Sequence, residues 1–195
     1  MSAPENVPAL VPDPAALVGL VEQLVDRPWP RSDEDRDALF EQLGFSSGEQ
    51  FDPERVDSAT KHYALATSLP GDVFSGWTAH DGHFMGINLQ PYTSKKPNNP
   101  DTRRGYDEVR ARLTAIYGEA ANVWDDGETP PCIWTVGGRL ITMHFFNRRH
   151  SGVMLSVDDA KLSDAAEAEA HAAAKTRVLP PELLAAIEEE ARRRS

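Results

Sequence analysis

The sequence has a single cysteine, Cys132, among its 195 residues. One cysteine cannot form an intrachain disulfide, so the chain is not a disulfide scaffold of the secreted type, and a reducing cytoplasm is its expected setting.

Basic residues are also scarce, because 20 lysines and arginines accompany 31 aspartates and glutamates and give a formal net charge of -11. This charge opposes binding to nucleic acid and to anionic membranes, and it favours a basic protein as partner.

Long apolar segments and catalytic motifs are missing as well. No window of 18 apolar residues occurs, so we expect no transmembrane helix. The proline-rich start, MSAPENVPALVPDP, lacks the basic region and apolar core of a signal peptide, and residues 1–13 are expected to be a disordered lead-in. The chain has no HExxH and no glycine-rich phosphate loop. The sequence therefore predicts no catalytic residue, no metal and no cofactor.

What the chain does contain is a strong β-hairpin signal between Cys132 and Val157. Gly137-Gly138 separates two β-rich runs, and such a pair tolerates the positive φ of a two-residue turn. With these glycines as the turn, the predicted cross-strand pairs are Cys132 with Met143, Trp134 with Ile141, and Val136 with Arg139. These pairs share one mostly apolar face of the hairpin. We expect that face to meet the core and Cys132 to be a small buried side chain. A third strand is predicted at Val153–Val157.

The opposite face of the same hairpin is mixed. It carries Ile133, Thr135, Leu140, Thr142, His144 and Phe146. A sheet with one lightly covered face is ordinary in antiparallel architecture, and such a face is also available for contact with another molecule.

The first half of the chain predicts two helices and three strands. Asp13 can cap a helix over Pro14–Asp26, and Ser32 with Asp35 begins a second helix that Gly44 ends. Strands are expected at 61–68, 73–80 and 83–90. The Asp81-Gly82 turn between the last two places Trp77 opposite Gly86. A loop at 91–104, containing Lys95, Lys96, Arg103 and Arg104, precedes a helix that runs to Tyr117.

These elements predict one α+β domain over residues 14–160. Its order is helix-helix, three strands, helix, three strands, helix, with about six antiparallel strands and the helices on one face. A further short strand is possible at Asn122–Trp124. Residues 161–195 are expected to be a helical tail, because they are rich in alanine and glutamate.

Two groups of polar residues invite a functional interpretation. Asp125, Asp126 and Glu128 form an acidic cluster that can contact a cationic partner or be an ordinary solvated turn. His80 and His83 flank the Asp81-Gly82 turn, but a zinc site needs three or four donors and no further one is evident.

Gly44-Phe45-Ser46-Ser47-Gly48 matches the G-x-S-x-G pattern without the strand before it and the helix after it that a nucleophile elbow requires.

Several segments resemble an uncharacterised actinobacterial family of small proteins associated with polymorphic toxin systems. These segments are DRPWPRSDEDRDALFEQLGF, GWTAHDGHFMGINL, YDEVRARLTAIYG and WDDGETPPCIWTVGGRLITMHFFNRRHSGVMLSVDD. The element order also resembles that of type III secretion chaperones. The resemblance covers about residues 15–160 and implies an immunity-like role, and it supplies no catalytic residues to assign in this chain.

Three functions remain open at this point. The first is a non-enzymatic binding protein, an immunity protein or secretion chaperone, that holds a basic toxin or effector through Ile133, Leu140 and Phe146 and through Asp125, Asp126 and Glu128. The second is a small hydrolase that uses His80, His83 or His144 with a carboxylate. The third is an adaptor subunit that docks through residues 161–195. The sequence does not determine the oligomeric state.

Overall fold

The computed structural model describes residues 8–51, 58–122 and 131–176. One compact unit ends at Ser163, and a second begins at Asp164 and is described only through Thr176. No helix among the described residues is both long and apolar enough to cross a membrane. The elements, in chain order, are α1 (Pro14–Asp26), α2 (Asp33–Leu43), β1 (Ser46–Phe51), β2 (Thr60–Ala66), β3 (Phe74–His80), β4 (His83–Ser94), α3 (Pro100–Tyr117), β5 (Ala121–Asn122), β6 (Cys132–Val136), β7 (Arg139–Asn147), β8 (Ser151–Asp159) and α4 (Ala160–Thr176).

The helices begin and end where local side-chain chemistry allows. The Asp13 carboxylate accepts the amide of Ala15 at 2.8 Å, and the Ser32 hydroxyl accepts the amide of Asp35 at 3.2 Å. Gly44 ends α2 with a φ of 68°, the left-handed conformation that glycine adopts most easily. The predicted bounds of α1 and the predicted caps of α2 are therefore confirmed.

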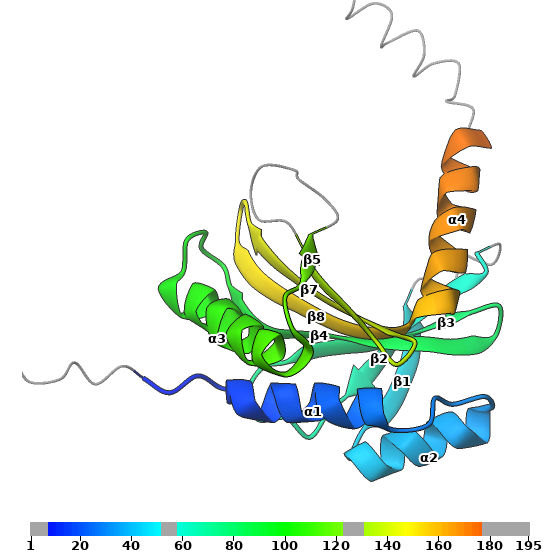
Figure 1. Ribbon diagram of the computed structural model, residues 1–195, viewed down its shortest axis with the longest axis horizontal. Helices are drawn as coiled ribbons and strands as arrows, with labels where there is room; N and C mark the ends of the chain where they lie inside the picture. The colour runs from blue at the N-terminus through cyan, green and yellow to red at the C-terminus, as the bar shows by residue number, and fades with distance from the viewer. Residues whose placement is uncertain (1–7, 52–57, 123–130, 177–195) are drawn as a thin grey trace, which may run out of the picture. The chain divides into compact units, whose positions relative to one another are not determined.

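All described strands form one antiparallel sheet in the order β1-β2-β3-β4-β8-β7-β6-β5 (Figure 1). The first four strands follow one another as neighbours, α3 crosses to the far edge, and β5 to β8 return toward the middle. β8 then pairs with β4, with Ile87 opposite Val157 and Leu89 opposite Leu155. This central pairing joins residues about seventy positions apart and makes one continuous sheet of the two halves.

The core lies between one face of this sheet and the helices α1, α2 and α3, which Figure 1 shows on the same side. α1 contributes Leu17, Val21 and Leu24, and α3 contributes Tyr106, Val109 and Leu113; all six are at most 1% exposed. Burial of such side chains contributes roughly 1.5–3 kcal/mol each, so this face is the main source of the fold's stability. The rest of the core from the sheet includes Trp77, Ile87, Cys132, Trp134, Ile141, Met143, Leu155 and Val157.

The expected α+β class, the antiparallel sheet and the hairpin register are confirmed. Cys132 pairs with Met143, Trp134 with Ile141, and Val136 with Arg139. Cys132 is buried as predicted, with 1% exposure, and its Sγ lies 3.2 Å from the hydroxyl oxygen of Tyr106. The G-x-S-x-G match at residues 44–48 does not form a nucleophile elbow. Such an elbow needs a strand before the serine and a helix after it, whereas here α2 precedes Ser46 and Ser46 begins β1.

The expected number of about six strands is wrong, because the described residues form eight. β1 is absent from the predicted order. β5 shares Asn122 with the short strand suggested at Asn122–Trp124, whose other two residues lie outside the described part of the chain. β1 has the sequence SSGEQF and is mostly exposed, so it carries no apolar periodicity that would identify it. It forms because β2 offers a free edge, with Ser46 opposite Ala66 and Phe51 opposite His62.

Two further expectations are corrected. The loop predicted at 91–104 is much shorter, because β4 continues to Ser94 and α3 begins at Pro100, where Asn99 accepts the amide of Thr102 at 3.0 Å. The predicted pairing of Trp77 with Gly86 is shifted by one residue. A β-bulge opposite Thr78 and Ala79 leaves Met85 of β4 unpaired and places Trp77 opposite Ile87, because a bulge adds one unpaired residue to a strand.

Candidate functional site

The sheet face opposite α1, α2 and α3 holds the apolar residues predicted for partner contact. Ile133, Leu140 and Phe146 are each half-buried. Ile133 lies opposite Thr142, two residues from Leu140 on the neighbouring strand, so these two apolar side chains are close. Phe146 lies six residues further along β7, about 20 Å away at roughly 3.3 Å per residue, and its ring is 4.4 Å from that of His144. The predicted residues therefore share a face but form two separate apolar positions.

Asp158 lies between these positions and the first half of the sheet. It is opposite Leu140 on β7 and opposite Gly86 on β4. Gly86 leaves room for it, because a Cβ atom there would lie 1.9 Å from Oδ1 of Asp158. The hydroxyl of Ser156 donates to Oδ2 at 2.8 Å. Burial raises the pKa of the Asp158 carboxyl to about 6, against the lowering effect of the Ser156 hydrogen bond.

Sequence reasoning did not single out Asp158. Its only sequence signal is its alternation with Val157 on a strand predicted to end there. The acidic residues that were singled out, Asp125, Asp126 and Glu128, lie outside the described residues.

The three candidate catalytic histidines are not brought together. His80 and His83 face each other across the β3–β4 turn. His80 is 4% exposed, and its Nδ1 lies 2.9 Å from the hydroxyl of Thr60. His144 is opposite Met154, four residues before Asp158 on β8, and so lies elsewhere on the sheet. Within the described residues, no three histidine, cysteine or acidic side chains gather as a metal site would require.

The chain was also compared with family models, curated proteins and solved structures. No match was found.

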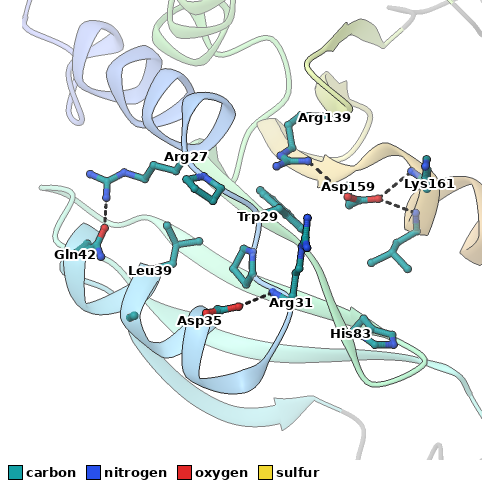
Figure 2. Close-up of a pocket in the computed structure, with 14 residues that line it drawn as sticks. Arg27, Trp29, Arg31, Asp35, Leu39, Gln42, His83, Arg139, Asp159 and Lys161 are labelled. Atoms are coloured by element: carbon teal, nitrogen blue, oxygen red, sulfur yellow. Dashed lines mark hydrogen bonds and ion pairs between the residues drawn. The ribbon is translucent and has the colours of Figure 1, made fainter.

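A second feature is a cleft of about 990 Å³ on the helix side of the sheet, within the unit that ends at Ser163 (Figure 2). The segment joining α1 to α2 forms one wall, and the first turn of α4 and the β3–β4 hairpin form the other. Its lining includes the basic side chains Arg27, Arg31, Arg139 and Lys161, the carboxylates Asp35 and Asp159, and His83. This basic cleft, as we call it, is unusual in a chain with a net charge of -11.

Arg139 is the most constrained cation of the basic cleft. Its side chain is 12% exposed, and its guanidinium carbon lies 4.4 Å from the centre of the Trp29 ring. Trp29 is fixed in turn, because its indole N–H donates to the carbonyl of Phe84 at 3.1 Å and its ring lies 4.9 Å from that of Phe84. Nη1 of Arg139 lies 3.6 Å from Oδ2 of Asp159, while Nε has no hydrogen-bond partner within the described residues. Burial lowers the pKa of Arg139.

The basic cleft was not predicted from the sequence. Its residues come from five separate segments, and the basic residues that stood out in the sequence were those at 91–104. Two of these are neutralised locally, because Arg103 pairs with Asp107 at 2.9 Å and Arg104 with Asp101 at 3.0 Å. Only the pairing of β7 with β8 and the position of the α1–α2 segment over it gather the cleft.

Proposed function

We propose that this protein is a non-enzymatic binding module, an immunity protein or secretion chaperone, that holds a basic toxin or effector. The observation that carries the proposal is the sheet face that α1, α2 and α3 leave uncovered (Figure 1), with Ile133, Leu140 and Phe146 half-buried on it. A net charge of -11 gives a basic partner long-range attraction to the protein. The resemblance to immunity-like proteins supports the same conclusion.

In this proposal, apolar residues of the sheet face bury against the partner, and acidic residues attract it and pair with its basic side chains. Ile133 and Leu140 form one apolar position and Phe146 another, and a partner that covers both also covers the part of β7 between Leu140 and Phe146. A basic side chain of a partner that covers Leu140 would lie near Asp158, which is opposite Leu140 on the neighbouring strand, and ionisation of that buried carboxyl becomes easier beside a positive charge. Asp125, Asp126 and Glu128 would act earlier, by accelerating the encounter.

Truncation of the apolar positions tests the binding face. We expect Leu140→Ser and Phe146→Ser each to weaken the complex by about tenfold, because a central apolar contact in an interface is worth roughly 1–2 kcal/mol. Ile116→Ser is the matched control, since Ile116 is 45% exposed but lies on α3, on the other side of the sheet. The measurement is capture by the tagged protein from lysate of the native organism, read by mass spectrometry, followed by titration of the captured partner.

The expected result is one stoichiometric basic partner that the Ile116→Ser variant retains and the two face variants lose. Capture of a partner that all three variants retain equally would place the interface elsewhere. Recovery of the protein alone, with no stoichiometric partner, would contradict the proposed function.

Charge reversal at the acidic cluster tests electrostatic steering. We expect Asp125→Lys, Asp126→Lys and Glu128→Lys together to slow association by several-fold and to weaken its dependence on ionic strength, with little change in dissociation. Stopped-flow association rates with the captured partner, measured at low and at physiological salt, provide the comparison. Equal rates for the variant and the wild type would remove the steering role of these residues.

A further inference from the structure

We infer that the basic cleft binds the phosphate group of a small organic phosphate monoester. The first reason is its charge. Four cations, Arg27, Arg31, Arg139 and Lys161, accompany two carboxylates, Asp35 and Asp159, so the cleft has an excess of two positive charges. A phosphate monoester carries a charge of about -1.5 to -2 at neutral pH and matches that excess.

The second reason is that the two carboxylates already have partners in the backbone. Oδ1 of Asp159 accepts the amides of Lys161 and Leu162 at 3.0 and 3.1 Å and so caps α4, as Figure 2 shows. Oδ2 of Asp35 accepts the amide of Arg31 at 3.1 Å. The charged groups of Arg31 and Lys161 themselves have no ion pair or hydrogen bond within the part of the chain that the structure describes. These two side chains are therefore available to a ligand.

The third reason is preorganisation. Arg139 is held between the ring of Trp29 and Asp159, and its ion pair with Asp159 is long, at 3.6 Å. A guanidinium removed from water gains from an additional oxyanion, and its planar array of donors matches phosphate geometry. Because Trp29 is fixed to β4 through the Phe84 carbonyl, little ordering of Arg139 is needed on binding.

The size and the walls of the basic cleft indicate an organic ligand. Its volume of about 990 Å³ is at the upper end of the range of about 300–1,000 Å³ for small-molecule sites. Pro30 and Leu39 are buried and line it, and Leu162 is half-buried beside them. An apolar group attached to the phosphate would contact these side chains, which inorganic phosphate leaves uncovered.

The basic cleft is independent of the proposed binding face. Arg139 and Asp159 pair on the helix side of the sheet, whereas their chain neighbours Leu140 and Asp158 pair on the opposite face. Side chains alternate along a strand, so a ligand in the basic cleft does not occupy the face that holds the protein partner. Loss of phosphate binding in the basic cleft and loss of partner binding at the sheet face can therefore be measured separately.

The test is calorimetric titration of the full chain with phenyl phosphate, inorganic phosphate and phenol at low ionic strength. We expect phenyl phosphate to bind in the millimolar range or tighter, inorganic phosphate to bind more weakly, and phenol not to bind. The double variant Arg31→Gln/Lys161→Gln should weaken phenyl phosphate binding by about tenfold, because it removes two charge-assisted contacts. Both side chains are exposed, so this variant should keep the fold.

Lys95→Gln/Lys96→Gln is the matched control, since both side chains are exposed and neither lines the basic cleft. It removes two positive charges elsewhere and should leave binding unchanged. Absence of phenyl phosphate binding at millimolar concentrations would overturn the inference. Equal weakening by the two double variants would also overturn it, since the effect would then be one of net charge. Tighter binding of inorganic phosphate than of phenyl phosphate would contradict the organic ligand.

Discussion

Replacing Gly105 by alanine lowers the free energy of unfolding by about 2 kcal/mol, because α3 packs on β4 with no room for a methyl group. A Cβ atom at Gly105 would lie 2.4 Å from Cδ2 and 2.6 Å from Cε2 of Tyr92. The ring cannot easily move away, since Tyr92 is 6% exposed and its hydroxyl donates to the carbonyl of Pro12 at 2.7 Å. Displacing it breaks a buried hydrogen bond as well as the packing, and this outweighs the gain of about 0.5–1 kcal/mol that alanine brings to a helix interior.

The control is Gly19→Ala. Gly19 lies inside α1, and a Cβ atom there has no neighbour within 4 Å. The same substitution should therefore raise the stability by about 0.5–1 kcal/mol through helix propensity alone. Urea denaturation of both variants at one pH gives the comparison. Equal stability changes at the two glycines would show that Tyr92 does not restrict position 105.

Replacing Asp158 by asparagine should stabilise the protein by about 2 kcal/mol at pH 8 and by almost nothing at pH 4. The pKa of the carboxyl is about 6 in the folded state and about 3.9 in an unfolded chain. The folded state thus holds this proton more tightly than the unfolded state does. The stability that this group contributes is present below about pH 4 and is lost as the pH rises through about 6.

Asparagine stays neutral at every pH and can still accept the hydrogen bond of Ser156, so it avoids the cost of burying a charge. Urea denaturation of the wild type and Asp158→Asn at several values from pH 4 to pH 8 measures the difference. Asp72→Asn, at an exposed position, controls for the loss of one negative charge. A difference between Asp158→Asn and the wild type that stays constant with pH would show that the carboxyl does not titrate in this range.

The Asp158 result also bears on the proposed function. If a basic partner covers the sheet face, its positive charge should favour ionised Asp158 and lower the pKa. The stabilising effect of asparagine should then disappear in the complex, because the neutral side chain no longer matches the partner.

Part of the candidate site could be read from the sequence. The face that carries Ile133, Leu140 and Phe146 follows from the Gly137-Gly138 turn and the alternation of side chains, and the structure confirms the register on which it depends. Asp158 and the basic cleft could not be read in this way. The neighbouring strands bury Asp158, whose carboxyl occupies the space that Gly86 leaves open. The basic cleft depends on pairing between β7 and β8 and on the position of Trp29.

The sequence by itself determined the features that depend on a few neighbouring residues. Asp13, Ser32 and Gly44 set helix ends because capping bonds span at most a few positions, and Gly137-Gly138 set a register because β6 ends and β7 begins at this turn. The tertiary structure alone decided the features that depend on distant partners. β1 becomes a strand because β2 offers an edge, and β4 continues to Ser94 because β8 pairs along it. Strand pairing supplies hydrogen bonds from elsewhere in the chain, and no local pattern records their source.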